Sequence, residues 1–167
     1  MPLNPVTLTT AILRLTDKTR SDFVGFPLVR TAGGDVDLVG TNQLVASNWA
    51  DTAARFFVEA VVPPPNPVAL AAGRSAFAQA MGAALNAPGG ATAAAALSAG
   101  WAAFAVAFAG LITPPVATPP PAPLVIPVGP PTANPVPPAA NIATAVFAWA
   151  KTGLYGVPPQ PPSIPWS

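Results

Sequence analysis

Proline is the residue that most constrains how this chain can fold, because 25 of its 167 residues are proline. A proline ring fixes φ and removes a backbone hydrogen-bond donor, so it ends a helix or a central strand. Most of these prolines follow residue 60, in clusters such as 63–65, 119–123 and 158–162. The stretches between clusters are therefore predicted to be separate regular elements, and the long cluster at 114–138 is predicted to be extended or polyproline II chain.

The apolar spacing predicts a mainly α-helical fold of about five helices. One begins at Pro5, and the others cover about residues 41–62, 67–86, 91–112 and 139–155. Asn4 and Asn66 each precede a proline, which is the pattern of an N-cap followed by the first helical residue. On the first helix Leu8, Ala11, Ile12 and Leu15 form an apolar stripe, while Thr7, Thr10, Arg14 and Lys18 face away from it.

A small β-hairpin is predicted near residues 26–39. Val36 and Leu38 alternate with Asp35 and Asp37 after a glycine pair at 33–34, which is the period-two pattern of a strand after a tight turn. Asp35 and Asp37 could ligate a calcium ion through their carboxylates. Two solvated acids on a hairpin are the simpler interpretation, so no metal site is predicted.

An internal duplication is suggested by two matching helix starts. "NPVTL" at residue 4 recurs as "NPVAL" at residue 66, and a third "NPV" begins at residue 134. The chain divides into a helix–hairpin–helix unit at 1–65, an Ala-rich helical hairpin at 66–113, an extended linker at 114–138, and a helix with a Pro-rich tail at 139–167. We expect these parts to form one structural domain with extended arms.

Charge is scarce and confined to one part of the sequence. Charged residues make up 8% of the chain, whereas a soluble domain has about 25%. None lies between residues 75 and 150. A surface without charge tends to associate with other surfaces. The few basic residues form no cluster, so the sequence indicates no nucleic-acid partner.

The helix expected at 91–112 is the most apolar. Its bulky residues follow one seam at spacings of four and three: Leu97, Trp101, Phe104, Phe108 and Leu111. The rest is almost all alanine and glycine. The segment is about long enough to cross a bilayer, which gives an alternative interpretation as a membrane-associated protein. The one-sided seam and the lack of flanking lysine or arginine favour instead a helix packed in a core, with a smooth back for another helix or subunit.

No constellation of catalytic residues is present. The chain has no histidine and no cysteine, which excludes the Ser-His-Asp triad and thiolate chemistry. Asp51, Arg55 and Glu59 share one helix face, which could be catalytic but is typical of a solvated face. Three tryptophans, Trp49, Trp101 and Trp149, could stack on sugars or bases, but their helical spacing favours a core. We therefore expect no enzyme, no cofactor and no metal.

The repeated Trp-bearing, Ala-rich helices ended by prolines resemble small Ala/Pro-rich structural proteins of tailed bacteriophages and related contractile injection machines. The resemblance rests on "NPVTL…NPVAL", "SNWADTAARFF", "SAGWAAFAVAF" and the proline tracts, over most of the chain. It implies a non-enzymatic minor virion protein of the capsid, neck, tail or baseplate, and it assigns no site residues. Ala-rich secreted helical proteins of actinobacteria are a second resemblance, but their Trp-x-Gly turn and N-terminal Pro-Pro-Glu are missing here.

The Pro-rich stretches are expected to lie along neighbouring subunits in the virion, in multiple symmetric copies. Such chain loses little conformational entropy on docking, because its φ angles are already fixed. The predicted contact segments are 114–138 and 157–167, and the predicted anchors are Leu124, Val125, Ile126, Ile164 and Trp166. On this hypothesis, removing residues 157–167 weakens incorporation into the particle but leaves the helical unit folded.

Overall fold

The fold is known from a computed structural model, which describes residues 3–16, 28–60, 62–112, 116–127, 136–159 and 161–167. Its elements, in chain order, are α1 (Pro5–Thr16), α2 (Leu38–Val58), α3 (Pro67–Leu85), α4 (Ala93–Gly110), β1 (Val116–Thr118), α5 (Val136–Ala150), β2 (Leu154–Gly156) and β3 (Ile164–Pro165). The mainly α-helical fold with five helices predicted from the sequence is confirmed in these residues.

Polar side chains begin four of the helices by accepting a hydrogen bond from a free backbone N–H group. Asn4 accepts from the N–H of Val6 at 2.9 Å, and Asn66 from the N–H of Ala69 at 2.7 Å. Two further residues do the same, Asp37 for α2 and Thr92 for α4. Because the first N–H groups of a helix have no partner within it, these caps fix where each helix starts.

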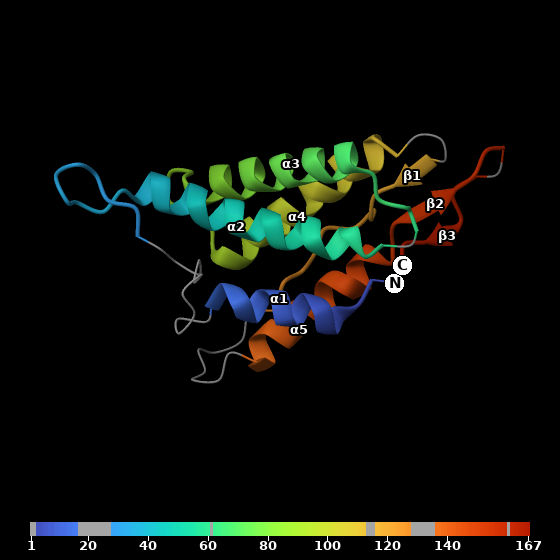
Figure 1. The fold of residues 1–167 in the computed structure, drawn as a ribbon, viewed down its shortest axis with the longest axis horizontal. Coiled ribbons are helices and arrows are strands. Elements are labelled where there is room, and N and C mark those ends of the chain that lie inside the picture. The colour runs from blue at the N-terminus through green and yellow to red at the C-terminus, as the bar shows by residue number, and fades with distance from the viewer. Residues whose placement is uncertain (1–2, 17–27, 61, 113–115, 128–135, 160) are drawn as a thin grey trace.

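The helices form two layers, as Figure 1 shows. The α2, α3 and α4 helices lie together, and α3 packs against both of the others. The α1 and α5 helices form a second layer, with α1 packed mainly on α5 and less closely on α2. The two matching Asn–Pro helix starts are thus followed by different packing, because α3 pairs with its successor α4 whereas α1 pairs mainly with α5.

The α3–α4 pair is held by a reciprocal contact between glycines and aromatic rings. A Cβ atom at Gly73 would lie 2.9 Å from the ring of Phe104 on α4. A Cβ atom at Gly100 would lie 2.7 Å from the ring of Phe77 on α3. Each helix therefore offers a glycine gap to the phenylalanine of the other. The crossed pairing shows that the two helices run antiparallel.

The aromatic core is centred on Phe57 of α2. Its ring is stacked on Phe104 at a centroid distance of 4.8 Å and lies 5.3 Å from Phe108. The ring of Trp166 meets it edge-on at 5.9 Å, and the whole Trp166 side chain is buried. The core thus combines residues of α2 and α4 with one from the end of the described chain.

The hairpin predicted near 26–39 is reduced to one antiparallel bridge, between Arg30 and Val36. Residues 26–27 lie outside the described residues. A turn with Gly34 at φ 89° closes the bridge, and the N–H of Thr31 donates to the carbonyl of Asp35 at 2.9 Å. The predicted alternation of Val36 and Leu38 does not extend as far as Leu38. Asp37 caps α2 instead, so the chain turns helical at Leu38.

The strands β1 and β3 form in segments that the sequence predicted to be extended arms. The strand β2 takes the end of the helix predicted at 139–155, because α5 ends at Ala150. The three-stranded sheet has the order β1-β2-β3, and both pairs of neighbours are antiparallel. Val116 pairs with Gly156, and Tyr155 pairs with Ile164. The indole N–H of Trp149 also donates to the carbonyl of Ala122 at 2.7 Å. The described Pro-rich chain is therefore fastened to its own domain.

Candidate functional site

A cleft of about 680 Å³ lies between α1 and α2, which run in opposite directions (Figure 1). Its volume is within the range of about 300–1,000 Å³ that small ligand sites occupy. The α1 helix contributes Val6, Thr7, Leu8, Thr10, Ala11, Arg14 and Leu15, and α2 contributes Asn48, Asp51, Thr52, Arg55, Phe56 and Glu59. The walls mix polar and apolar residues, and the most completely buried of them, Leu8 and Phe56, are apolar.

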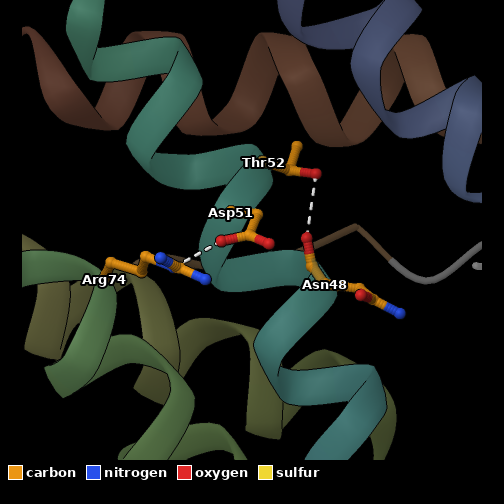
Figure 2. Close-up of polar contacts among 4 residues, drawn as sticks. All are labelled: Asn48, Asp51, Thr52 and Arg74. Carbon is orange, nitrogen blue, oxygen red and sulfur yellow. Dashed lines mark hydrogen bonds and ion pairs between the residues drawn. The ribbon is translucent and has the colours of Figure 1, made fainter. Parts of the chain in front are cut away.

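Four charged residues line this cleft, in a chain that has few. The negative charge of Asp51 is neutralised by a residue that does not line the cleft, because Asp51 forms an ion pair with Arg74 of α3, as Figure 2 shows. Both partners of that pair are largely exposed, at 55% and 42% of their side-chain surface. Arg14 and Arg55 form no ion pair within the part of the chain that the structure describes. The cleft and Arg74 together carry three arginines and two carboxylates, which leaves one net positive charge.

Glu59 lies at the C-terminal cap of α2 and is half-buried. Its Oε2 atom is buried and, among the described residues, has no hydrogen-bond donor. A buried polar atom without a partner costs roughly 1–3 kcal/mol. A donor in the cleft would remove that cost once the carboxylate turns to expose this oxygen atom.

The threonine hydroxyls of the cleft are oriented by their own helices. Thr10 donates to the carbonyl of Val6 at 3.0 Å. Thr52 donates to the carbonyl of Asn48 at 3.1 Å, a bond drawn in Figure 2. Each hydroxyl hydrogen is therefore engaged, and the oxygen lone pairs remain as acceptors. The cleft thus offers arginine donors for an anionic group and several acceptors for N–H groups.

The residues predicted as partner anchors occupy two different environments. Leu124, Ile126 and Trp166 are buried in the core of their own chain, so they are not exposed to a partner in this fold. Val125 and Ile164 are exposed, at 78% and 47% of their surface. The alternation along 124–126 explains the difference, because an extended chain turns successive side chains to opposite sides. The role of the five residues as partner anchors stays a prediction, and only Val125 and Ile164 have exposed side chains for it.

The predicted seam of α4 lies in the core, except at its last member. Leu97, Trp101, Phe104 and Phe108 are buried, whereas Leu111 ends the helix and is 42% exposed. Trp49 and Trp149 are buried as well. The α4 helix is nevertheless long and apolar enough to cross a membrane, with 44% of the segment Ala93–Gly110 buried inside the protein. It is the single helix of the described residues that meets this criterion.

The acidic residues give no metal-binding cluster within the described residues. Asp37 caps α2 by accepting from the N–H of Gly40 at 2.9 Å. Its neighbour Asp35 lies in the exposed turn.

No protein-family model matches the chain, and no curated protein or solved structure matches it either.

The cleft itself was missed in the sequence. Its two walls were both recognised as polar helix faces, one through Thr7, Thr10 and Arg14 and the other through Asp51, Arg55 and Glu59. Each face alone is typical of a helix surface in water. Only the packing of α1 beside α2 shows that the two faces meet. A surplus of polar residues on two helices of so apolar a chain was the available signal.

Proposed function

We propose that the chain is a non-enzymatic structural subunit of a multi-protein assembly, and that this assembly is a bacteriophage virion. The chain would be a minor protein of the capsid, neck, tail or baseplate. The observation that carries the proposal is the uncharged outer surface of α4. All 18 residues of α4 are uncharged, and its exposed positions are Ala93, Ala95, Val106 and Gly110.

Larger apolar side chains extend this surface at one end of the pair. Val106 is 61% exposed and Leu111 42% exposed. Val68, at the start of α3, is 67% exposed. It lies at the same end, because the side-chain amide of Asn66 donates to the carbonyl of Leu111 at 3.2 Å. Exposed apolar side chains gathered at one end of a helix pair are typical of sites of association. We call Val68, Val106 and Leu111 the α3–α4 apolar end.

The contacts that we propose with neighbouring subunits therefore differ from the five anchors predicted from the sequence. Of the five anchors predicted from the sequence, Val125 and Ile164 keep exposed side chains. Together with the α3–α4 apolar end they are the proposed contacts with neighbouring subunits. The neighbours are other structural proteins of the same particle, in multiple symmetric copies, because symmetry repeats one contact without new sequence.

A membrane-associated protein is the second candidate, and the length and hydropathy of α4 favour it. Its aromatic side, however, is covered by α2 and α3, as shown by Trp101 beside Phe56 and Phe77. Inserting α4 in a bilayer would require that core to open. Partition into detergent, with protection of residues 93–110 from protease by lipid vesicles, would favour this candidate over the virion protein.

The proposal is tested by mass spectrometry of purified particles from the source. We expect the chain in the particles at a constant ratio to the major proteins. Val106→Lys should reduce its incorporation severalfold, because a lysine in an apolar contact must lose its water. Val58→Lys is the matched control, since Val58 is 57% exposed near the end of α2. Absence of the chain from particles and recovery in host membranes would overturn the proposal.

A further inference from the structure

We propose that the cleft between α1 and α2 binds an extended acidic peptide segment of a neighbouring subunit. This inference rests on the proposed role in an assembly and names the partner chemistry of one site. The peptide would lie along the cleft, with carboxylates on Arg14 and Arg55 and backbone N–H groups facing acceptors of the cleft walls. Shape, charge, hydrogen bonding and the apolar floor each support this occupant.

The shape suits an extended chain. The lining residues run from Val6 to Leu15 on one helix and from Asn48 to Glu59 on the other. At 1.5 Å per helical residue, each wall is roughly 15 Å long. An extended peptide advances about 3.3 Å per residue, so four or five residues match that length.

The charge favours an anion. The ion pair with Arg74 neutralises Asp51 from the α3 side. Arg14 and Arg55 then face a single remaining carboxylate, that of Glu59. Both arginines are exposed and make no ion pair with any described residue. A guanidinium binds a carboxylate with two parallel hydrogen bonds, so two acidic side chains would complete the pairing.

The hydrogen-bonding groups require that the ligand also carry donors. The Oε2 atom of Glu59 is buried without a donor among the described residues. The hydroxyls of Thr10 and Thr52 already donate to their own helices and can only accept. A fully ionised dicarboxylate has no donor to give them, whereas a peptide has an N–H group at nearly every residue. An acidic peptide therefore satisfies both sets of groups.

The floor of the cleft is apolar and would exclude water from these bonds. Leu8 and Phe56 are almost completely buried there, and Leu15 lies beside them at 7% exposure. Hydrogen bonds and ion pairs are stronger where the surroundings are less polar than water. A peptide with small side chains between its acidic residues would cover this floor without steric conflict.

Binding is tested on the full chain with three probes. The first is a capped five-residue peptide in which alanines alternate with one aspartate and one glutamate. The second has asparagine and glutamine at those two positions, and the third is glutarate. We expect saturable calorimetric binding of the acidic peptide below about 1 mM. The amide peptide lacks the charges and glutarate lacks N–H donors, so both should bind at least about fivefold more weakly.

Variants locate the site. Arg14→Gln and Arg55→Gln should each weaken binding of the acidic peptide about fivefold, which is about 1 kcal/mol. Lys151→Gln is the control, because it removes an exposed positive charge outside the cleft. Amide NMR signals of α1 and α2 should shift on titration while those of α3 do not. Three outcomes would overturn the inference. They are equal binding of the acidic and amide peptides, unchanged binding in both arginine variants, and no saturation at peptide concentrations up to about 10 mM.

The two proposals fail separately. If the chain is a constant component of particles but the acidic peptide does not bind, the cleft inference is wrong and the structural role stands. If the peptide binds at the cleft but the chain is absent from particles, the assignment to a virion is wrong. The double variant Arg14→Gln and Arg55→Gln tests both proposals together. If both hold, mass spectrometry should find much less of this variant than of the parent chain in purified particles.

Discussion

Single residues decide how closely the helices of this protein approach. At Gly100 there is no room for a methyl group, because a Cβ atom would lie 2.7 Å from the ring of Phe77. At Gly110 nothing lies within 4 Å of the same atom. Both glycines belong to α4, so the two positions differ mainly in the space around them.

Gly100→Ala should therefore destabilise the protein by about 1–3 kcal/mol, which is the usual cost of overfilling a packed core. Gly110→Ala should be neutral or stabilising by up to about 1 kcal/mol, because alanine favours the helix. Urea denaturation followed by circular dichroism measures both. A Gly100→Ala protein as stable as the parent would show that α3 and α4 do not meet at these residues.

The sequence was informative about residues inside helices and less so about residues in extended chain. Trp101, Phe104 and Phe108 were correctly placed in a core, because helical spacing assigns each position to a face. Leu124 and Ile126 were expected to face a partner, and in this fold they are buried in their own chain. In extended chain, residues 124 and 126 point to the same side and residue 125 to the other. Apolar residues at 124 and 126 therefore indicate that this side is covered, but not whether the chain itself or a partner covers it.

At the scale of the element, the helices depend on the residues before them. Asn66 has two roles at the start of α3. Its Oδ1 caps the N–H of Ala69 at 2.7 Å, and its Nδ2 donates to the carbonyl of Leu111 at 3.2 Å. The same side chain therefore begins α3 and ties it to the end of α4.

Substitutions at Asn66 should separate these roles. Asn66→Ala removes both bonds and should cost about 1–2 kcal/mol. Asn66→Asp keeps the capping oxygen and adds a negative charge at a helix N-terminus, where it is favourable. It loses only the donor to Leu111, so it should cost less than the alanine variant. Thermal unfolding of the two variants tests this order, and the reverse order would contradict the capping role.

Most helix boundaries could be predicted within a few residues because caps and prolines mark them locally, but α5 ends at Ala150 rather than near Tyr155. The sheet could not be predicted. Its strands are only two or three residues long, and their pairing joins Val116–Thr118 to Leu154–Gly156 across α5. No local pattern in a proline-rich segment specifies such a distant partner, so polyproline II was the natural expectation. The hairpin near 26–39 is present but shorter than predicted, because Asp37 caps α2 and the chain becomes helical at Leu38.

At the scale of the whole molecule, the segment 157–167 closes the core. Trp166 is fully buried, and its ring lies so close to Gly153 that a Cβ there would be 2.7 Å away. Its backbone N–H donates to the carbonyl of Gly153 at 3.0 Å. Ser167 and Val62 exchange two backbone hydrogen bonds of 2.8 and 3.2 Å. The expectation that this segment could be removed without unfolding the helices is therefore revised.

Trp166→Ala should lower the free energy of unfolding by about 3–5 kcal/mol, as expected when a large aromatic side chain leaves a cavity. Deleting 157–167 should destabilise the protein further. Ile164→Ala, at a half-exposed position of β3, should cost less than about 1 kcal/mol. Chemical denaturation compares the three. A truncated chain with the unfolding midpoint of the parent would show that the segment is an independent arm.

The contact between Phe57 and Trp166 also bears on the rate at which the protein folds. The α3–α4 pair joins neighbours in sequence, so its closure costs little chain entropy. The aromatic centre is completed only when a residue near the end of the described chain reaches α2. The same is true of α1 on α5. Because long loops must close before such contacts stabilise anything, this fold should form more slowly than a helical bundle of similar size held by local contacts.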